Sequence, residues 1–500
     1  MDLGPRIRTI LSIAPDADAI EFQGHWRSWG ELSAVAEAVA DALDTCGVEP
    51  GGAVGLVLRN DPAMIGAILG VVLAERCVVT VNPHHPDQAL GDEVRDLALP
   101  VLVAVGSDWQ RAELRDAACV VGSAAICVGF GDSAVRFLDG LHRIRGGNHR
   151  PPAPGIAVEM LTSGTTGPPK RIPLAYDAFE RTITAAGDHY RTNRDADLAP
   201  RLRSGVAIVA APLVHMSGMF RTLLNVCDGR RIALLERFQV DEWLALVRDH
   251  RPRAVSLVPT ALRMVLDAEV DPRDLRSIEV VTSGSAALPP DVQEVFESRF
   301  GIAVLPSYGA TEFAGGVAGW TLALHREWGA LKRGSVGRPQ PGRRIRVVDP
   351  ESGAGVPRDT AGRLEVGTSD GEWVRTTDIA RIDADDFVWI EGRADDTILR
   401  GGFKVFPGEI SDVLLRHPAV QDAGVTGIDD ARLGAVPVAV VQLSAGCRVT
   451  EEELMEHLRA NLASYKVPAR LRIVDTLPRT PSMKLSQPGI KELFTSRSGG

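Results

Sequence analysis

The sequence lacks several features that mark specialised classes of protein. Its six cysteines are scattered and form no Cys-x-x-Cys pair, which argues against a zinc site, a redox motif or a disulfide framework. Basic residues are not in excess, since 55 lysines and arginines face 65 acidic residues, for a net charge of −10. Nucleic-acid-binding proteins usually carry a basic balance or patch, so we expect no nucleic-acid partner. A nucleotide ligand stays open, because a few local cations suffice to bind it.

Long hydrophobic runs are also missing. The longest, residues 63–74, is too short to cross a bilayer and predicts a buried helix. The first residues carry charges at Asp2, Arg6 and Arg8 and have no apolar segment of the kind found in signal peptides. We therefore expect no membrane span and a cytoplasmic protein.

The composition is that of a soluble globular protein. Hydrophobic residues make up 45% of the chain and charged residues 24%, both close to the average. At roughly 100–200 residues per domain, 500 residues suggest two to four domains.

From about residue 50 to 310, short β-branched runs alternate with amphipathic stretches, which predicts βαβ units and a largely parallel sheet. The clearest stretch predicts strands over 254–258, 278–282 and 302–305, with helices over 259–268 and 291–300 between them. Ligands bind beyond the carboxyl ends of such strands. The segments at those ends are small or polar and comprise residues 259–260, 283–287 and 307–312. We expect them to lie on one rim and to border a pocket.

The pattern changes beyond about residue 340. Short runs near turn residues predict antiparallel strands over 344–348, 362–366 and 387–390. The last hundred residues predict a separate α+β unit with helices over 409–416 and 450–462 and strands over 435–443 and 470–474. Thr450 and Glu453 have the spacing of a capping box. We expect an N-terminal domain over residues 1–394 and a C-terminal domain over 395–500.

Residues 162–170, Thr-Ser-Gly-Thr-Thr-Gly-Pro-Pro-Lys, have the composition of a phosphate cradle. Glycines let backbone N–H groups turn toward an anion, hydroxyls add donors, and Lys170 supplies a point charge. The segment follows a predicted strand over 156–161. It is not a P-loop, because Pro168 and Pro169 stand where the helix of that motif would begin.

Two further segments carry groups suited to a nucleotide. In Tyr308-Gly-Ala-Thr-Glu312, the tyrosine offers a stacking face, Gly309 allows close approach, and Glu312 is an oxygen ligand of the kind Mg²⁺ prefers. In Arg375-Thr-Thr-Asp378, a carboxylate can accept from both hydroxyls of a ribose. Each of these segments is weak evidence by itself.

The last two segments lie at and beyond the predicted domain boundary. Residues 392–409 combine charged residues with a glycine pair, which suits a hinge. Residues 478–484 place Lys484 in a proline-rich loop, where a lysine is ordinarily only solvated.

Taken in this order, these segments resemble the adenylate-forming superfamily, which includes acyl- and aryl-CoA ligases, stand-alone adenylation domains and beetle luciferases. The resemblance covers roughly residues 20–494. It implies an α/β fold with a large multi-sheet N-terminal domain and a small α+β C-terminal lid, with ATP bound between them. The lid is the predicted domain 395–500.

The resemblance also implies roles for individual residues. Around ATP it places Thr162, Ser163, Gly164, Thr165, Thr166, Gly167, Lys170, Gly284, Ser285, Ala286, Ser307, Tyr308, Gly309, Ala310, Asp378 and Arg393. It implies catalytic roles for Lys484, Thr311, Glu312 and His215, with Mg²⁺ on Glu312. Lys484 would bridge the substrate carboxylate and the α-phosphate. Asp395 matches the hinge about which the lid rotates between two half-reactions.

Two further groups of residues concern the acid and the acceptor. The acyl pocket implied by the resemblance is lined by His215, Met216, Gly218, Met219, Val258, Ser283, Gly309, Ala314 and Gly315. Many of these residues are small, which favours a bulky aromatic or an extended alkyl acid over acetate, and no acidic residue besides Glu312 would select an amino group. The CoA site implied comprises Gly401, Gly402, Phe403, Lys404 and Lys466, with Arg400 as a further cation near it.

The sequence departs from the usual pattern at several positions. Met483 precedes Lys484 and Thr377 precedes Asp378 where glycine is usual, Arg171 follows Lys170 where glycine is common, and Lys404 replaces an amide. None of these changes removes a side chain assigned to chemistry.

The expected function is an AMP-forming acid–CoA ligase that uses ATP, Mg²⁺ and CoA, as a monomer or homodimer. The alternatives are a ligase that loads the phosphopantetheine arm of a carrier protein, and a non-catalytic nucleotide- or acyl-binding protein.

Overall fold

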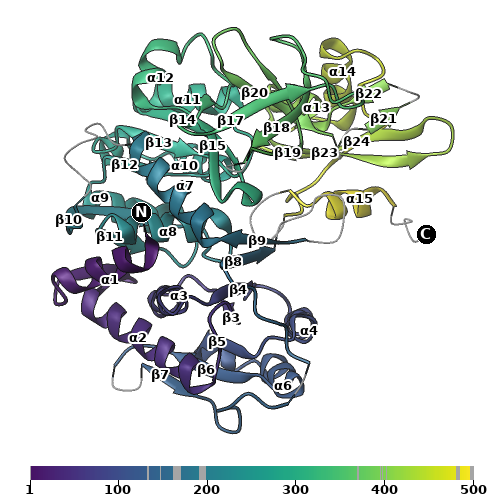
Figure 1. Cartoon of the computed structure of the whole chain (residues 1–500). Helices are drawn as coiled ribbons and strands as arrows, with labels where there is room; N and C mark the ends of the chain where they lie inside the picture. The colour runs from purple at the N-terminus through teal and green to yellow at the C-terminus, as the bar shows by residue number, and fades with distance from the viewer. Residues whose placement is uncertain are drawn as a thin grey trace.

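The structure is a computed structural model. It describes residues 2–131, 134–146, 148–161, 170–190, 199–368, 371–394, 396, 398–400, 403–479 and 485–495, and only the backbone of 186–190, 399 and 404. Figure 1 shows a first α/β layer at the bottom, further sheets above it, and a C-terminal unit at the upper right. Across the described residues, no helix combines the length and apolar character needed to cross a membrane.

The first layer is built on a seven-stranded sheet in the order β7-β6-β5-β3-β4-β8-β9. Its strands are β3 (Ala53–Val57), β4 (Cys77–Val81), β5 (Val101–Val105), β6 (Ala124–Val128), β7 (Val135–Phe137), β8 (Ile156–Leu161) and β9 (Arg171–Ala175). The pairs among β3, β4, β5, β6 and β8 are parallel. Every residue of β3 to β6 is buried, as expected when helices cover both faces of a parallel sheet.

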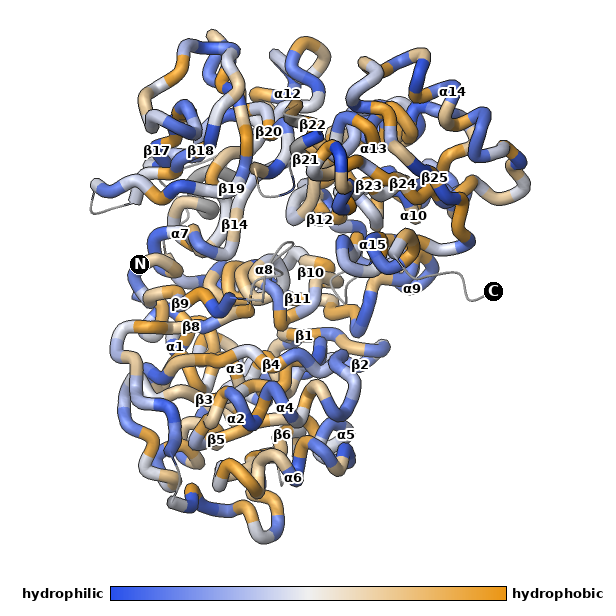
Figure 2. Tube along the Cα trace, turned by 90° about the vertical axis from the view of Figure 1, so that its right-hand side faces the viewer, coloured by the Kyte–Doolittle hydropathy of each residue, from blue (hydrophilic) through white to orange (hydrophobic). Residues whose placement is uncertain are grey.

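The helices of this part are α1 (Leu3–Ile13), α2 (Trp29–Thr45), α3 (Pro62–Leu73), α4 (Asp87–Leu97), α5 (Gly106–Trp109), α6 (Ala112–Val121) and α7 (Tyr176–Tyr190). Helix α3 is buried from Pro62 to Val72, which confirms that the longest hydrophobic run is a buried helix. Figure 2 shows the hydrophobic residues concentrated along β3, β5, α2 and α3 in the interior of this layer.

The second sheet has four strands in the order β10-β11-β1-β2. It contains β1 (Asp18–Phe22), β2 (His25–Ser28), β10 (Arg203–Val209) and β11 (Arg230–Leu234), with α8 (Met216–Cys227) and α9 (Val240–His250) alongside.

The next sheet, in the order β12-β13-β14-β15-β16, contains the stretch that the sequence predicted most clearly. Its strands are β12 (Ala254–Ser256), β13 (Val280–Ser283), β14 (Ala303–Ala310), β15 (Gly315–Gly319) and β16 (Arg338–Pro339). Its helical segments are α10 (Pro259–Asp267), η1 (Pro272–Leu275), α11 (Pro290–Phe300), η2 (Thr311–Phe313) and α12 (Leu322–Trp328). The parallel pairing of β12, β13 and β14 confirms the prediction.

Strand β14 is longer than predicted. It continues from Ala303 to Ala310, so Tyr308 lies within the strand and not after it. The reason is antiparallel pairing with β15, in which Ser307 faces Gly319 and Ala310 faces Gly315. That partner is a glycine-rich segment without strand periodicity, so the sequence pattern did not reveal the pairing.

An antiparallel sheet, in the order β17-β18-β19-β20, completes the N-terminal part. It contains β17 (Arg344–Val348), β18 (Gly362–Gly367), β19 (Trp373–Ile382) and β20 (Val388–Arg393). The antiparallel pairing confirms the change of pattern predicted beyond residue 340. Asp378 lies inside β19, a strand that the sequence pattern did not predict.

The C-terminal unit has its own sheet, in the order β22-β21-β24-β23, with β25 parallel to β24. Its elements are β21 (Ile398–Arg400), β22 (Phe403–Val405), α13 (Pro407–Leu415), β23 (Val420–Asp430), β24 (Gly434–Leu443), α14 (Glu451–Asn461), β25 (Arg470–Ile473) and α15 (Gln487–Thr495). The Thr450–Glu453 capping box is present at the start of α14, as predicted. The α/β fold with a smaller α+β unit is thus the one expected.

Candidate active site

Tyr308 and Asp378, assigned to adenine and ribose, are in contact. The Tyr308 hydroxyl on β14 donates a hydrogen bond to the Asp378 carboxylate on β19, across 70 positions of sequence. Burial, together with the negative charge of Asp378, raises the pKa of the Tyr308 phenol, so the hydroxyl keeps its proton and remains a donor. The sheets that contain β14 and β19 therefore meet at this point, where the ring of Tyr308 lies beside the carboxylate of Asp378.

Asp378 is fixed by its strand. Its backbone N–H donates to Thr376 Oγ1 at 3.1 Å, and in the sheet it is paired with Arg393 of β20. Such antiparallel partners lie about 5 Å apart at their Cα atoms. Arg393 Nε lies 3.8 Å from the carboxylate of Asp396. Arg393, which is paired with Asp378, thus lies two positions before Asp395, the residue expected at the hinge.

The segment Gly284-Ser285-Ala286 lies beside Ser307 of the neighbouring strand. Ser307 Oγ donates to the Ser283 carbonyl at 3.2 Å, and a Cβ at Gly284 would stand 2.8 Å from Ser307 Oγ, so a larger residue there would displace the Ser307 side chain. Ser285 has a φ of +71°, a left-handed conformation that is uncommon for serine and recurs at functional sites. The carboxyl end of β13 therefore lies beside the middle of β14, which brings the segments 283–287 and 307–312 together there.

Thr311 and Glu312 lie on the short turn η2, which ends at Ala314 with a φ of +55°. Glu312 is exposed, and its carboxylate is a suitable ligand for Mg²⁺ that is also held by substrate phosphates. No cluster of three or more potential metal ligands occurs among the residues that the structure describes.

Arg343 holds the turn that carries Glu312, and sequence reasoning missed it. Its guanidinium donates to the carbonyls of Phe313 at 3.0 Å and Gly316 at 3.1 Å, and to Thr182 Oγ1 at 3.1 Å. Burial lowers the pKa of Arg343. Nothing in its local sequence distinguishes this arginine from the others, because all three acceptors are remote in the chain.

His215 stands at the N-cap of α8, after a tightly packed turn. The buried Asn60 accepts from the Leu213 N–H at 2.8 Å and donates to the Leu235 carbonyl at 2.9 Å. At Gly218 a Cβ would stand 2.1 Å from the Pro212 carbonyl oxygen. Asn60 was also missed, since its partners lie more than 150 positions away.

The segments assigned to the acyl pocket adjoin one another. Arg221 of α8 donates to Thr282 Oγ1 at 3.1 Å, and a Cβ built on Gly315 would lie 3.8 Å from the Phe220 ring. Met216 is half-buried, Met219 is fully buried in the core, Ser283 Oγ is buried, and Val258 caps α10.

Gly309 and Gly315 lie at close approaches between elements. A Cβ at Gly309 would lie 2.3 Å from the Gly315 carbonyl oxygen, and one at Gly315 would lie 2.7 Å from Thr182 Cγ2. A side chain at either position would therefore meet protein. These glycines allow β14, β15 and α7 to approach one another.

On the C-terminal unit, Phe403 is 59% exposed and stacks on Tyr465, with ring centroids 4.9 Å apart. Lys466 forms an ion pair with Glu409 at 2.6 Å, and the hydrogen bond to Glu409 raises the pKa of Lys466. Arg400 donates to the carbonyls of Tyr465 and Val467. Lys466 and Arg400, two of the three cations expected near CoA, thus already have partners within the protein.

Several predicted residues fall outside the described part of the chain: Thr162, Ser163, Gly164, Thr165, Thr166, Gly167, Asp395, Gly401, Gly402, Lys484 and the side chain of Lys404. The described residues beside the first of these segments are fixed. Arg171, next to the exposed Lys170, bonds Glu93 at 2.5 Å and the Thr80 carbonyl at 3.0 Å.

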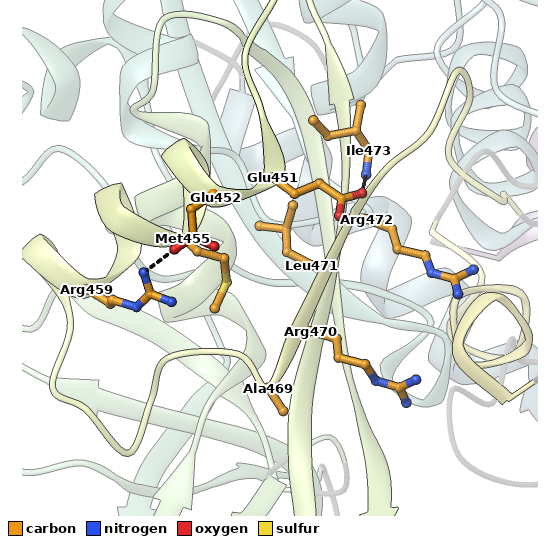
Figure 3. A pocket seen from close by; sticks show the side chains of 9 residues that line it. All are labelled: Glu451, Glu452, Met455, Arg459, Ala469, Arg470, Leu471, Arg472 and Ile473. Carbon is orange, nitrogen blue, oxygen red and sulfur yellow. Dashed lines mark hydrogen bonds and ion pairs between the residues drawn. The ribbon is translucent and has the colours of Figure 1, made fainter.

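A separate cavity of about 490 Å³ lies between α14 and β25 (Figure 3). It is lined by Glu451, Glu452, Met455, Arg459, Ala469, Arg470, Leu471, Arg472 and Ile473. Its charges are mixed and partly paired, as in the 2.7 Å contact between Arg459 and Glu452. None of the predicted site residues lines it.

Comparisons with known proteins cover nearly the whole chain. The AMP-binding enzyme family matches residues 11–370, and the AMP-binding enzyme C-terminal domain matches residues 409–484. The 2-succinylbenzoate–CoA ligase of Geobacillus sp. (strain WCH70) is 30% identical over 477 residues, 92% of this chain and 91% of that protein.

Plant and structural relatives agree with this match. The 4-coumarate–CoA ligase 5 of Oryza sativa subsp. japonica is 27% identical over 92% of this chain and 88% of its own length. The structure of ATP-bound MatB from Rhodopseudomonas palustris is 26% identical, covers 99% of both chains and has a TM-score of 0.82. The matched families, together with the relative that is 30% identical over 92% of this chain, show that the chain belongs to the AMP-binding enzyme family.

Proposed function

We propose that the chain is an ATP-dependent, AMP-forming carboxylic acid–CoA ligase. The observation that carries the proposal is the contact between Tyr308 and Asp378, which unites the candidates for adenine and ribose at one edge of the sheets. The aryl-acid–CoA ligases among the relatives support the reaction class.

In the first half-reaction, an oxygen of the acid's carboxylate attacks the α-phosphorus of ATP. The bond from that phosphorus to the bridging oxygen breaks, and pyrophosphate leaves an acyl adenylate behind. Tyr308 stacks on adenine, Asp378 accepts from the ribose hydroxyls with Arg393 beside it, and residues 162–167 surround the phosphates. Catalysis consists mainly of positioning and charge stabilisation.

Thr311 and Lys484 stabilise charge on the α-phosphate, and Lys484 also holds the acid's carboxylate. Glu312 provides the protein's ligand for Mg²⁺, which when bound neutralises phosphate charge. Arg343 keeps the Glu312 turn in place through three hydrogen bonds to groups that are fixed in the fold.

In the second half-reaction, the thiol loses its proton and its sulfur attacks the acyl carbonyl carbon. The bond from that carbon to the AMP oxygen breaks, which releases AMP and a thioester. Rotation of the lid about Asp395 withdraws Lys484 and brings Gly401, Gly402 and Phe403 to the site. His215 gates the acyl pocket.

The proposed acid is aromatic. Two relatives are named for 4-coumarate and 2-succinylbenzoate, both aromatic acids. The half-buried Met216 and the Phe220 ring beside Gly315 offer apolar surface of the kind that ring-binding pockets use.

A second acceptor is favoured by one observation. Lys466 is paired with Glu409, and Arg400 is occupied by two backbone carbonyls, so these two cations near the expected CoA site are already partnered. The alternative thiol acceptor is the phosphopantetheine of a carrier protein, which lacks the 3′-phosphate of CoA that such cations would bind.

The test is a pyrophosphate-release screen with ATP and Mg²⁺ over alkyl, benzoic, cinnamic and polycyclic acids, each with and without CoA. We expect turnover with an aromatic acid that requires CoA and gives its thioester. Acid-dependent pyrophosphate release without a thioester would indicate a carrier-protein acceptor. An absence of release with every acid would overturn the proposed function.

A further inference from the structure

A chain of hydrogen bonds links the N-terminal domain to the segment that precedes Lys484. Gln421 Nε2 on β23 donates to Asp267 Oδ2 on α10 at 3.0 Å, which joins the two domains. Gln442 Nε2 on β24 donates to Gln421 Oε1 at 3.1 Å. The Leu477 N–H donates to Gln442 Oε1 at 3.3 Å. Leu477 is thereby connected to Asp267 through two glutamine side chains.

The direction of this chain is fixed at both ends. A backbone N–H can only donate and an ionised carboxylate can only accept. Each glutamine must therefore turn its carbonyl toward Leu477 and its NH₂ toward Asp267. Because both amides use both of their polar ends, a change at one position alters the bonds at the others.

The local fold aims Gln421 out of the sheet. Along β23 and β24, Val420 faces Leu443 and Asp422 faces Gln442, so Gln421 is the extra residue of a β-bulge. Strand β23 is at the edge of its sheet. Bulges at sheet edges commonly redirect one side chain, and here the redirected side chain reaches the other domain.

Asp267 is held in an electrostatically unfavourable place. It is the last residue of α10, where the helix dipole disfavours a carboxylate. Arg299 donates to the carbonyls of Leu266 and Val270 on either side of this helix end and fixes it. The exposed carboxylate thus presents a rigid acceptor to Gln421.

The other end of the chain is the base of the Lys484 segment. Arg479 forms an ion pair with Asp422, the residue after Gln421. The Ser486 N–H donates to the Pro478 carbonyl at 2.8 Å, and Arg479 pairs with Leu485 as a β-bridge. The residues on both sides of 480–484 are therefore joined to one another and to the bulge.

We propose that Gln421 is a positioning residue that holds the lid and the base of the Lys484 segment together in the orientation used for adenylate formation. The inference rests on the proposed function, because it gives Lys484 its role in that step. Gln421 makes the contact with Asp267, and Gln421 and its neighbour Asp422 together support residues 477–479. If the contact with Asp267 is lost, we therefore expect the lid to be released with the Lys484 segment still attached to it.

The decisive variant is Gln421→Glu, which places a carboxylate against Asp267. We expect adenylate formation to slow roughly three- to tenfold, because one exposed hydrogen bond is replaced by repulsion. Thioester formation from supplied acyl adenylate should not slow. Adding Asp267→Asn should restore the rate, since the asparagine NH₂ can donate to the introduced carboxylate while Gln442 still donates to its other oxygen. Gln88→Glu, beside Asp92 on α4, is the matched control within one domain.

A second readout does not depend on activity. Cys119 in the N-terminal domain and Cys447 in the lid are exposed, so fluorescent labels on them report the orientation of the lid. We expect Gln421→Glu to change the transfer efficiency and the double variant to restore it. Equal slowing of both half-reactions, no rescue by Asp267→Asn, or an unchanged label distance would overturn the proposal. An inactive wild-type protein whose labels respond as expected would overturn the proposed function but leave the interdomain contact standing.

Discussion

The proposed nucleotide floor and the proposed lid contact are built in different ways. The floor, meaning residues 283–286, 307–310 and Asp378, contains the Tyr308–Asp378 bond, the Ser307–Ser283 bond and a glycine packed against Ser307. The C-terminal unit contacts the N-terminal part through an exposed bond between Gln421 and Asp267. The two floor bonds are partly buried and cost more to leave unpaired than the exposed bond, which exchanges with water at little cost. The groups of the proposed floor are therefore held more firmly than the contact between the two units.

The largest expected effect is on the lid side. Lys484→Ala should slow adenylate formation on the order of 1000-fold, because removal of a group that stabilises transition-state charge has effects of this size. Pyrophosphate release measures it. Lys491→Ala, an exposed lysine on α15, is the control and should stay near wild type. Near-normal release by Lys484→Ala would contradict the role of this lysine.

Next in size is a change in the floor. Tyr308→Phe leaves Asp378 without its phenol donor and should lower kcat/KM for ATP about 10- to 100-fold, the range for a hydrogen bond to a charged group. Titration of the initial rate with ATP measures it. The control is Tyr176→Phe, which removes another phenol hydroxyl, one that is bonded to the Arg76 carbonyl. This variant should lower the free energy of unfolding and leave kcat/KM for ATP unchanged. An unchanged KM and kcat in Tyr308→Phe would show that the contact does not shape the ATP site.

A smaller, selective effect is expected at the hinge. Asp395→Pro fixes φ at the residue about which the lid should rotate. It should slow thioester formation roughly tenfold and spare adenylate formation, because only the second step needs the rotated lid. Stopped-flow assays of the separate half-reactions measure this, with Asp395→Ala as the control that removes the carboxylate alone. Equal loss of both steps would count against the hinge.

The smallest effect concerns the stability of the region behind the floor. Burial would raise the pKa of Glu297, but hydrogen bonds from His325, the Val304 amide and Arg333 outweigh it and lower the pKa from 4.5 to about 2. Because the folded-state pKa is depressed, Glu297 stabilises the protein above about pH 4.5 and loses this contribution as the pH falls toward 2. Glu297→Gln should lower the free energy of unfolding by about 2 kcal/mol at pH 7. Urea unfolding between pH 3 and pH 7 should then show a flatter pH dependence than in the wild type.

Local sequence patterns predicted the elements whose signals lie within a few residues. The buried α3, the capping box of α14 and the parallel strands β12 to β14 follow from hydrophobic runs, side-chain spacing and strand–helix alternation. Tyr308 and Asp378 were named from their segments, and the structure brings them into contact.

Long-range pairings escaped prediction. The continuation of β14 to Ala310 depends on a glycine-rich partner strand, and the hydrogen bonds made by Arg343 and Asn60 depend on acceptors far away in the chain. An arginine or asparagine carries no local mark of such a role, since its acceptors are mostly backbone carbonyls that any sequence provides.

The sequence by itself determined the order of the chemical segments, the two-part architecture and the kind of reaction, because these depend on residue types at fixed local spacings. Only the tertiary structure decided that Gly309 and Gly315 allow strands to approach one another and that Lys466 and Arg400 have internal partners. It also decided that a bulged glutamine reaches across to Asp267. These features depend on which groups, far apart in the sequence, come into contact, and the packing of the whole chain determines those contacts.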